Sequence, residues 1–265
     1  MSAGLPQTLR AEWIKLRSVR STGWSLVTGI GLMLGLSALV CASSTTTGGS
    51  PGHPGDNDIV RDSLSGVWVG QIPFVLLAVL AIANEYSTGM IRTTFAANPR
   101  RWATVTSKWA LVGALVLVTA LLASAASFAL GQSLLRGNGF NYQGGYDPVS
   151  LSDGPALRAV VGTALYLTAL ALLAFGIAAI VRGTATAISL VLGLVFVPLI
   201  AAGLLPEGAG DFLQRATPIA GLASQQTVDR PDAIPAGPWT GIGVAFAYAF
   251  VSLVVALWLI RRRDA

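Results

Sequence analysis

The chain has 265 residues, a single cysteine and a formal net charge of +5, and 53% of its residues are hydrophobic while only 11% are charged. Soluble domains carry about 25% charged residues, so this composition excludes an ordinary soluble protein. One cysteine excludes an intramolecular disulfide. The basic balance does not indicate nucleic-acid binding, because none of the polar intervals is long enough to fold as a soluble domain that could carry a basic patch.

The first predicted element is a short amphipathic helix over residues 6–20. Apolar side chains at helical spacing form a stripe along it, and basic side chains lie off that stripe. We expect this helix to lie in the membrane interface. Its expected interfacial residues are Leu9, Trp13, Lys15, Leu16 and Arg17. The alternative is a disordered basic tail that only sets the topology.

Six long stretches contain no Asp, Glu, Lys, Arg or His. They cover residues 24–42, 66–83, 109–135, 159–181, 185–205 and 240–260. Each has about the 20 apolar residues that a helix needs to cross the hydrocarbon core of a bilayer. The sequence therefore predicts an all-α polytopic membrane protein, with six transmembrane helices in a single transmembrane domain over residues 1–265.

The charges between the stretches alternate in sign from one side to the other. One set of segments, which includes both termini, holds 12 basic and 3 acidic residues, and the other set holds 5 basic and 9 acidic residues. Basic residues in short loops are retained in the cytoplasm. Both termini are therefore predicted to be cytoplasmic in a multi-pass plasma-membrane protein.

Few polar residues interrupt the spans. Gln71, Gln132 and Tyr166 are the candidates that we select for a translocation pathway. A pathway lined mainly by apolar residues suits an amphiphilic substrate, such as a drug, a lipid or a peptide, better than a sugar or an ion.

The segment between the second and third spans is expected to contain a short helix over residues 86–97. That helix should end before Pro99, because the residue that precedes a proline avoids the α region. Arg100 and Arg101 then open a cytoplasmic extension of the third span. The segment 206–239, predicted to be extracytoplasmic, mixes apolar residues with five prolines, and we expect short helices there that dip toward the outer interface.

The segment between the second and third spans resembles a known family. An acid at the exit of the second span (Glu85), a glycine (Gly89), Ile-Arg-Thr-Thr, a Pro-Arg pair and a lysine that enters the next span resemble the permease subunits of ABC-2 type transporters. The N-terminal residues 11–22 are similar to the opening of actinobacterial members. The six-span plan and the long last outer loop match as well, whereas Met90 replaces the threonine of many relatives.

The resemblance implies an exporter permease in a bacterial cytoplasmic membrane. Residues 85–99 would form the cytoplasmic coupling helix that docks on a separate ATPase subunit, and residues 6–20 would form the interfacial connector helix. The residues implied in ATPase coupling are Glu85, Gly89, Ile91, Arg92, Phe95, Pro99, Arg100 and Arg101. A second permease copy, identical or related, would complete the pathway.

The chain itself carries no phosphate-binding Gly-x-x-x-x-Gly-Lys-Ser/Thr motif, so ATP would act through the partner subunit. We expect no catalytic, metal-binding or cofactor-binding residues and no enzymatic activity. A secondary transporter or channel is an alternative, although those usually place an ionisable residue within the membrane. A membrane anchor or sensor that recruits an ATPase without moving solute is another. An intramembrane enzyme would need an acid–base pair or a metal motif.

Overall fold

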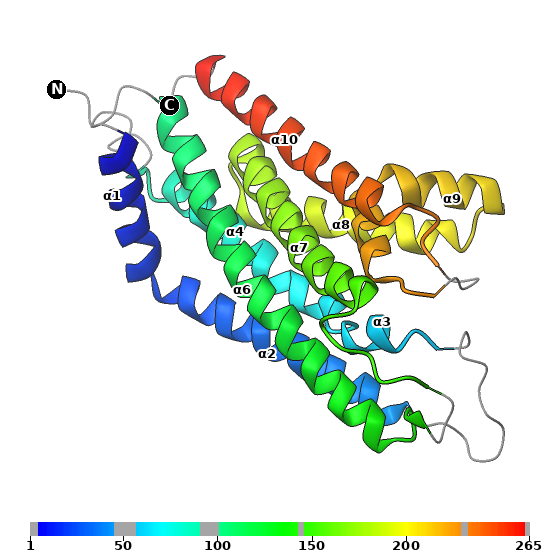
Figure 1. Ribbon diagram of the computed structural model, residues 1–265. Coiled ribbons are helices and arrows are strands. Elements are labelled where there is room, and N and C mark those ends of the chain that lie inside the picture. Colours follow the sequence, from blue (N-terminus) through cyan, green and yellow to red (C-terminus); the bar gives the residue numbers. More distant parts are fainter. Residues whose placement is uncertain (1–4, 45–56, 91–100, 143–145, 229–232, 263–265) are drawn as a thin grey trace.

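The computed structural model describes residues 5–44, 57–90, 101–142, 146–228 and 233–262, and this part of the chain is α-helical with one 3-10 helix (Figure 1). The elements in chain order are α1 (Leu5–Ser18), α2 (Arg20–Ser43), α3 (Ile59–Ser63), α4 (Val67–Ser87), α6 (Arg101–Gly137), α7 (Gly154–Val181), α8 (Thr184–Ala202), α9 (Glu207–Ala216), the 3-10 helix η2 (Pro218–Gln225) and α10 (Pro238–Arg262). Among the described residues, six helices are long and apolar enough to cross a membrane: α2, α4, α6, α7, α8 and α10. The chain is therefore an all-α, multi-pass membrane protein.

The helices run past most of the ends of the uncharged stretches. α2 begins at Arg20 rather than Trp24, and α6 has 37 residues, so at 1.5 Å per residue it is about 55 Å long. The hydrocarbon core is only about 30 Å thick. Charged residues are tolerated at such helix ends because their side chains reach into the headgroup region. The absence of charge therefore locates each span but underestimates the length of the helix that contains it.

The N-terminal helix is present, but it ends earlier than expected. α1 stops at Ser18, and Val19 adopts an extended conformation with φ −84° and ψ 116° before α2 begins. Leu16 is buried in the protein, whereas Trp13, in the same predicted stripe, is 44% exposed. The buried face of α1 also includes Glu12, which is only 3% exposed. The helix thus packs on the protein through a mixed face rather than through the apolar stripe alone.

α7 is the central helix of the bundle. Of its apolar window 78% is buried, compared with 22% for α8, and α7 packs against α4, α6, α10 and η2. Small residues dominate α7, and they let neighbouring helices approach closely. The peripheral helices α2 and α8 bury a much smaller share of their surface, so the core of the protein surrounds α7.

Two glycines mark the closest approaches between elements. A Cβ atom on Gly66, which caps α4, would lie 1.8 Å from the carbonyl oxygen of Met33 in α2. A Cβ atom on Gly241 would lie 1.9 Å from the carbonyl oxygen of Ala220 in η2. Only glycine fits at these contacts. By contrast, nothing lies within 4 Å of a Cβ atom built on Gly31.

The described part of residues 206–239 contains two short helices, as expected, and one of them is buried within the protein. All eight residues of η2 are buried, and η2 packs against α7 and α10. Tyr248 of α10 donates a hydrogen bond to the carbonyl oxygen of Ala216 over 2.9 Å. Burial in protein shields the non-α backbone of η2, which a bilayer would not tolerate in contact with lipid.

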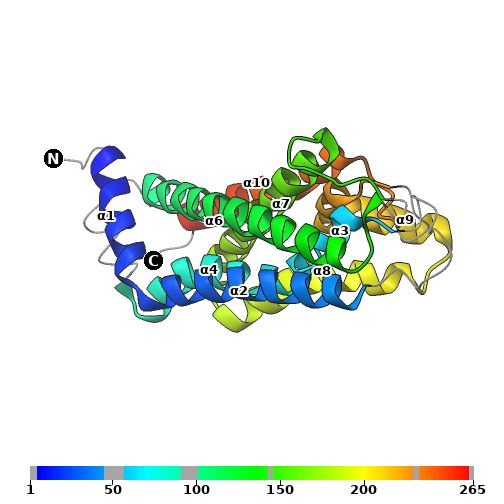
Figure 2. The same cartoon turned by 60° about the horizontal axis from the view of Figure 1, so that its bottom comes forward.

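The two ends of the bundle are built differently (Figure 2). α1 stands across one end, where α4 and α10 finish and α6 begins; we call this the α1 end. α9 lies at the opposite end, the α9 end, where α2 and α6 finish and α10 begins. α1 and the last turn of α10 lie at the same end, as the predicted even number of spans requires.

Candidate functional site

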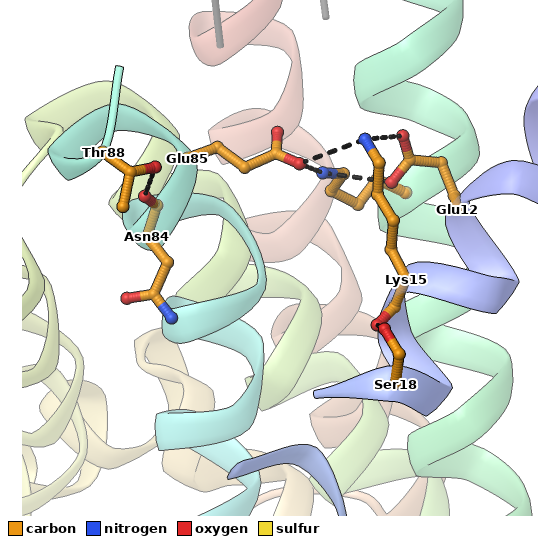
Figure 3. A network of polar contacts seen from close by, with 7 residues as sticks. Glu12, Lys15, Ser18, Asn84, Glu85 and Thr88 are labelled. Atoms are coloured by element: carbon orange, nitrogen blue, oxygen red, sulfur yellow. Dashed lines mark hydrogen bonds and ion pairs between the residues drawn. The ribbon is translucent and has the colours of Figure 1, made fainter. Parts of the chain in front are cut away.

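Four charged side chains from three elements meet at the α1 end (Figure 3). Glu12 and Lys15 are one turn apart on α1, Glu85 lies in the last turn of α4, and Lys108 lies two turns into α6. We call these four residues the charge cluster. Lys15 and Lys108 are the two lysines of the whole sequence. The cluster joins parts of the chain that are far apart in sequence.

Lys108 stands at the centre of the charge cluster. Its Nζ lies 3.1 Å from Glu12 Oε2 and pairs with Glu85 Oε1. Lys15 Nζ donates to Glu12 Oε1 over 3.3 Å and lies 3.6 Å from Glu85 Oε1. Each carboxylate therefore contacts both lysines. The two carboxylates and two ammonium groups are electrically neutral together.

Three members of the cluster are deeply buried. Glu12 and Lys108 are each 3% exposed and Glu85 is 8% exposed, while the side chain of Lys15 is 40% exposed. A buried charge without a partner costs several kcal/mol, so removal of one member penalises those that remain. The cluster therefore ties the positions of α1, the end of α4 and the start of α6 to one another.

The chain turns immediately after Glu85. α4 ends at Ser87, and Thr88 caps it by donating its hydroxyl proton to the carbonyl oxygen of Asn84 over 2.7 Å. Gly89 then has φ +70°, a left-handed conformation that favours glycine. The predicted coupling helix thus begins differently from expectation, because Glu85 and Tyr86 belong to α4. Four residues, 86–89, separate Glu85 from Met90, the last residue described before the predicted docking segment.

The structure describes only some of the other residues predicted for this region. Ile91, Arg92, Phe95, Pro99 and Arg100 lie outside the described residues, as do the side chains of Leu9, Arg17 and Arg101. Lys15 and Glu85, chosen for different roles, are brought together. Glu12 and Lys108 were not assigned to the site from the sequence. Their scarcity was the available signal, since Lys108 is one of two lysines and Glu12 one of three acids on the basic side of the chain.

A cavity of about 270 Å³ lies beside the charge cluster. Its wall combines all four cluster residues with side chains of α4 and of the junction between α1 and α2. Apolar groups form most of the wall. The cavity is therefore amphipathic, with a charged end and a hydrocarbon-like body.

The three polar residues proposed for the pathway are buried inside the bundle. Tyr166 donates to Gln71 Oε1 over 2.8 Å, and both side chains are fully buried. Gln132 donates to Ser63 Oγ over 3.1 Å and to the carbonyl oxygen of Ile59 over 3.3 Å. Each of these three side chains is therefore hydrogen-bonded within the chain. In this conformation their polar atoms are used to join helices.

A third buried carboxylate lies at the α9 end. Asp58, which is 1% exposed, caps α3 by accepting from the backbone N–H of Arg61 over 3.0 Å. It also accepts from the N–H and the hydroxyl of Thr227 over 2.6 and 2.7 Å and from the N–H of Val228 over 3.2 Å. We call Asp58, Thr227 and Val228 the Asp58 clasp. It joins the segment before α4 to the segment before α10.

A scan of the sequence against models of known protein families finds no match, and a search of curated proteins finds none either.

Proposed function

We propose that the protein is the permease subunit of an ATP-driven ABC-2 type exporter that works with a separate ATPase subunit. The observation that carries the proposal is the charge cluster. It lies directly before the segment expected to dock on the ATPase, and its ion pairs join the end of α4 to α1 and α6. A displacement of the docking segment would therefore reach α1 and the start of α6 as well.

The same elements lead directly into the spans. A single extended residue, Val19, separates α1 from α2, and both α4 and α6 run from the cluster into the bundle without a break. Alternating access by rigid-body rocking of helices needs such stiff connections. Both termini face the cytoplasm in this proposal, and the α9 end faces outward, in a bacterial plasma membrane.

The proposed cargo is an amphiphile such as a drug, a lipid or a peptide. The spans offer apolar surface, and the polar side chains Gln71, Gln132 and Tyr166 are used in helix contacts. Two permease copies, identical or related, would form the pathway, and ATP would bind only to the partner subunit.

Purification of the tagged full-length protein in mild detergent, followed by mass spectrometry, tests the proposal. We expect a stoichiometric ATPase to co-purify with the wild type and to be reduced at least about tenfold by Glu85→Ala or Arg92→Glu. Asp211→Ala is the matched control, because Asp211 forms an exposed ion pair with Arg215 at the α9 end. A wild-type protein that purifies as a stable oligomer without any ATPase would contradict the proposal and favour a secondary transporter or an anchor.

A further inference from the structure

The cavity beside the charge cluster is large enough for more than isolated water molecules. Its volume of about 270 Å³ is many times the roughly 10–15 Å³ that a single water needs, and it is close to the lower limit of small-molecule pockets. Buried water needs polar partners, and much of this wall offers none. The cavity therefore favours a ligand with an apolar part.

The apolar wall follows α4 into the span. Leu77, Leu80 and Ala81 line the cavity from α4, and Leu16 faces them from α1. Leu77 and Glu85 are eight residues apart, which is about 12 Å along a helix axis. One leaflet of the hydrocarbon core is about 15 Å thick. The wall thus has the length and direction of the upper part of an acyl chain.

The rim of the cavity offers donors for an anion. Ser21 and Thr22 lie in the first turn of α2, and no side chain caps that helix terminus. The N-terminus of a helix favours a phosphate, because its first backbone N–H groups have no partner within the helix. The N–H of Thr22 donates to the carbonyl oxygen of Val19 over 3.1 Å, so the hydroxyl groups of Ser21 and Thr22 are the donors that these two residues offer. Lys15 is the exposed member of the cluster. Its ammonium group carries three protons and makes two contacts in the cluster, of 3.3 Å with Glu12 and 3.6 Å with Glu85. Phosphate therefore has partners on this side.

The same cavity also offers an acceptor for a cation. Glu85 lines it, and Glu85 Oε2 is buried and accepts no hydrogen bond from the described part of the chain. Figure 3 shows the other oxygen of this carboxylate in contact with the lysines. Because the cluster is neutral as a whole, a ligand that carries both a phosphate and an ammonium group preserves the charge balance.

We propose that this cavity binds one membrane phospholipid whose zwitterionic headgroup ends in a primary ammonium. The phosphate lies at Lys15 and the start of α2, the ammonium faces Glu85, and one acyl chain packs along Leu77 and Leu80. A primary ammonium has N–H donors for the carboxylate, which a trimethylated headgroup lacks. The lipid fills the gap between α1 and α4 next to the cluster. The proposal does not depend on an ATPase partner.

Native mass spectrometry of the full-length protein tests this site. The detergent-solubilised protein is offered equal amounts of phosphatidylethanolamine, phosphatidylcholine and phosphatidylglycerol with identical acyl chains. We expect one retained phosphatidylethanolamine per chain, with a preference of about tenfold over each of the other two lipids. Ala81→Leu, which fills the apolar wall without altering a charge, should lower retention by about tenfold.

Two further variants keep the test specific. Ala247→Leu adds the same side chain at an exposed position of α10 and should leave retention unchanged. Lys15→Gln should lower retention of phosphatidylethanolamine while the protein still elutes as a monodisperse peak. Equal retention of the three lipids, a preference for phosphatidylglycerol, or retention that Ala81→Leu does not alter would overturn the proposal.

Discussion

The two ends of the molecule hold a buried carboxylate in different ways. At the α9 end, Asp58 accepts four hydrogen bonds from backbone N–H groups and a hydroxyl, and both of its oxygens are satisfied. At the α1 end, Glu85 shares one oxygen between two lysines, and its other oxygen accepts no hydrogen bond from the described residues.

The difference distinguishes a fixed joint from an adjustable one. Backbone donors are directional and cannot move without local unfolding, so the Asp58 clasp holds one geometry. Ion pairs tolerate a wider range of geometry, and a shared ammonium can lean toward either carboxylate. The α1 end, which holds the charge cluster, is therefore the end at which a partner could move helices without breaking every contact. Variants at the two ends test this difference, from the largest expected effect to the smallest.

The first prediction is that the two ends lie on opposite sides of the membrane. With Cys41, the buried natural cysteine, replaced by alanine, Ser152→Cys at the α9 end should react with a membrane-impermeant maleimide in intact cells. Ser18→Cys at the α1 end should react only after permeabilisation. Gel-shift labelling measures both, and reaction of Ser18→Cys in intact cells would contradict the topology.

The second prediction concerns the two lysines of the cluster. Lys108→Met removes the central partner of two buried carboxylates and should lower the free energy of unfolding by about 3–5 kcal/mol. Lys15→Met is the matched control, and it should cost only about 0–1 kcal/mol because the Lys15 side chain is partly exposed and water screens its pairs. Thermal unfolding in detergent compares the variants. Equal costs would show that burial does not set the strength of the cluster.

The third prediction concerns the Asp58 clasp. Asp58→Ala leaves the N–H groups of Thr227 and Val228 without their acceptor and removes the cap of α3, and we expect a loss of about 2–3 kcal/mol. Asp153→Ala removes an exposed carboxylate that accepts from the N–H of Ser150 at the same end, and should cost less than about 1 kcal/mol. The same unfolding assay applies. An Asp58→Ala variant as stable as the Asp153→Ala variant would show that the Asp58 clasp does not hold the α9 end in one geometry.

The fourth prediction concerns α4, which connects the two ends. Gly66→Ala forces a methyl group against the Met33 carbonyl and should cost about 1–3 kcal/mol. Gly31→Ala enters open space inside α2, where alanine is favoured over glycine in a helix by about 0.5–1 kcal/mol. Opposite signs of the two changes in unfolding temperature are expected. A neutral Gly66→Ala would mean that the start of α4 is free to move.

The spans were predictable from the sequence, since a lipid-exposed helix excludes charge over its whole hydrocarbon length. Their ends were less predictable: α2 begins four residues before Trp24 because hydrogen bonding continues past the hydrocarbon boundary. The helix α3 was missed because its five residues carry no periodicity. Short helices were expected in residues 206–239, but the burial of η2 was not, because it depends on packing against α7 and α10.

The candidate site was only half predictable. Glu85 was selected from its place at a span exit, and Lys15 from its place on an amphipathic helix, but nothing in either pattern shows that they meet. The pairing of Glu12 with Lys108 depends on how α1 folds back onto α6, which is a property of tertiary packing. The sequence predicts an apolar stripe through Trp13 and Leu16, and it does not show that the charge pairing also places Glu12 on the buried face of α1.

The most direct test of the account is the rate of ATP hydrolysis by the assembled complex in lipid vesicles, measured for Glu85→Gln, Lys108→Met and the double variant. If the cluster transmits motion as one unit, each single variant lowers the rate by about tenfold or more, and the double variant is no worse than the more damaging single one. Single variants that leave the rate unchanged, or effects that add independently in the double variant, would contradict a coupling role for the cluster.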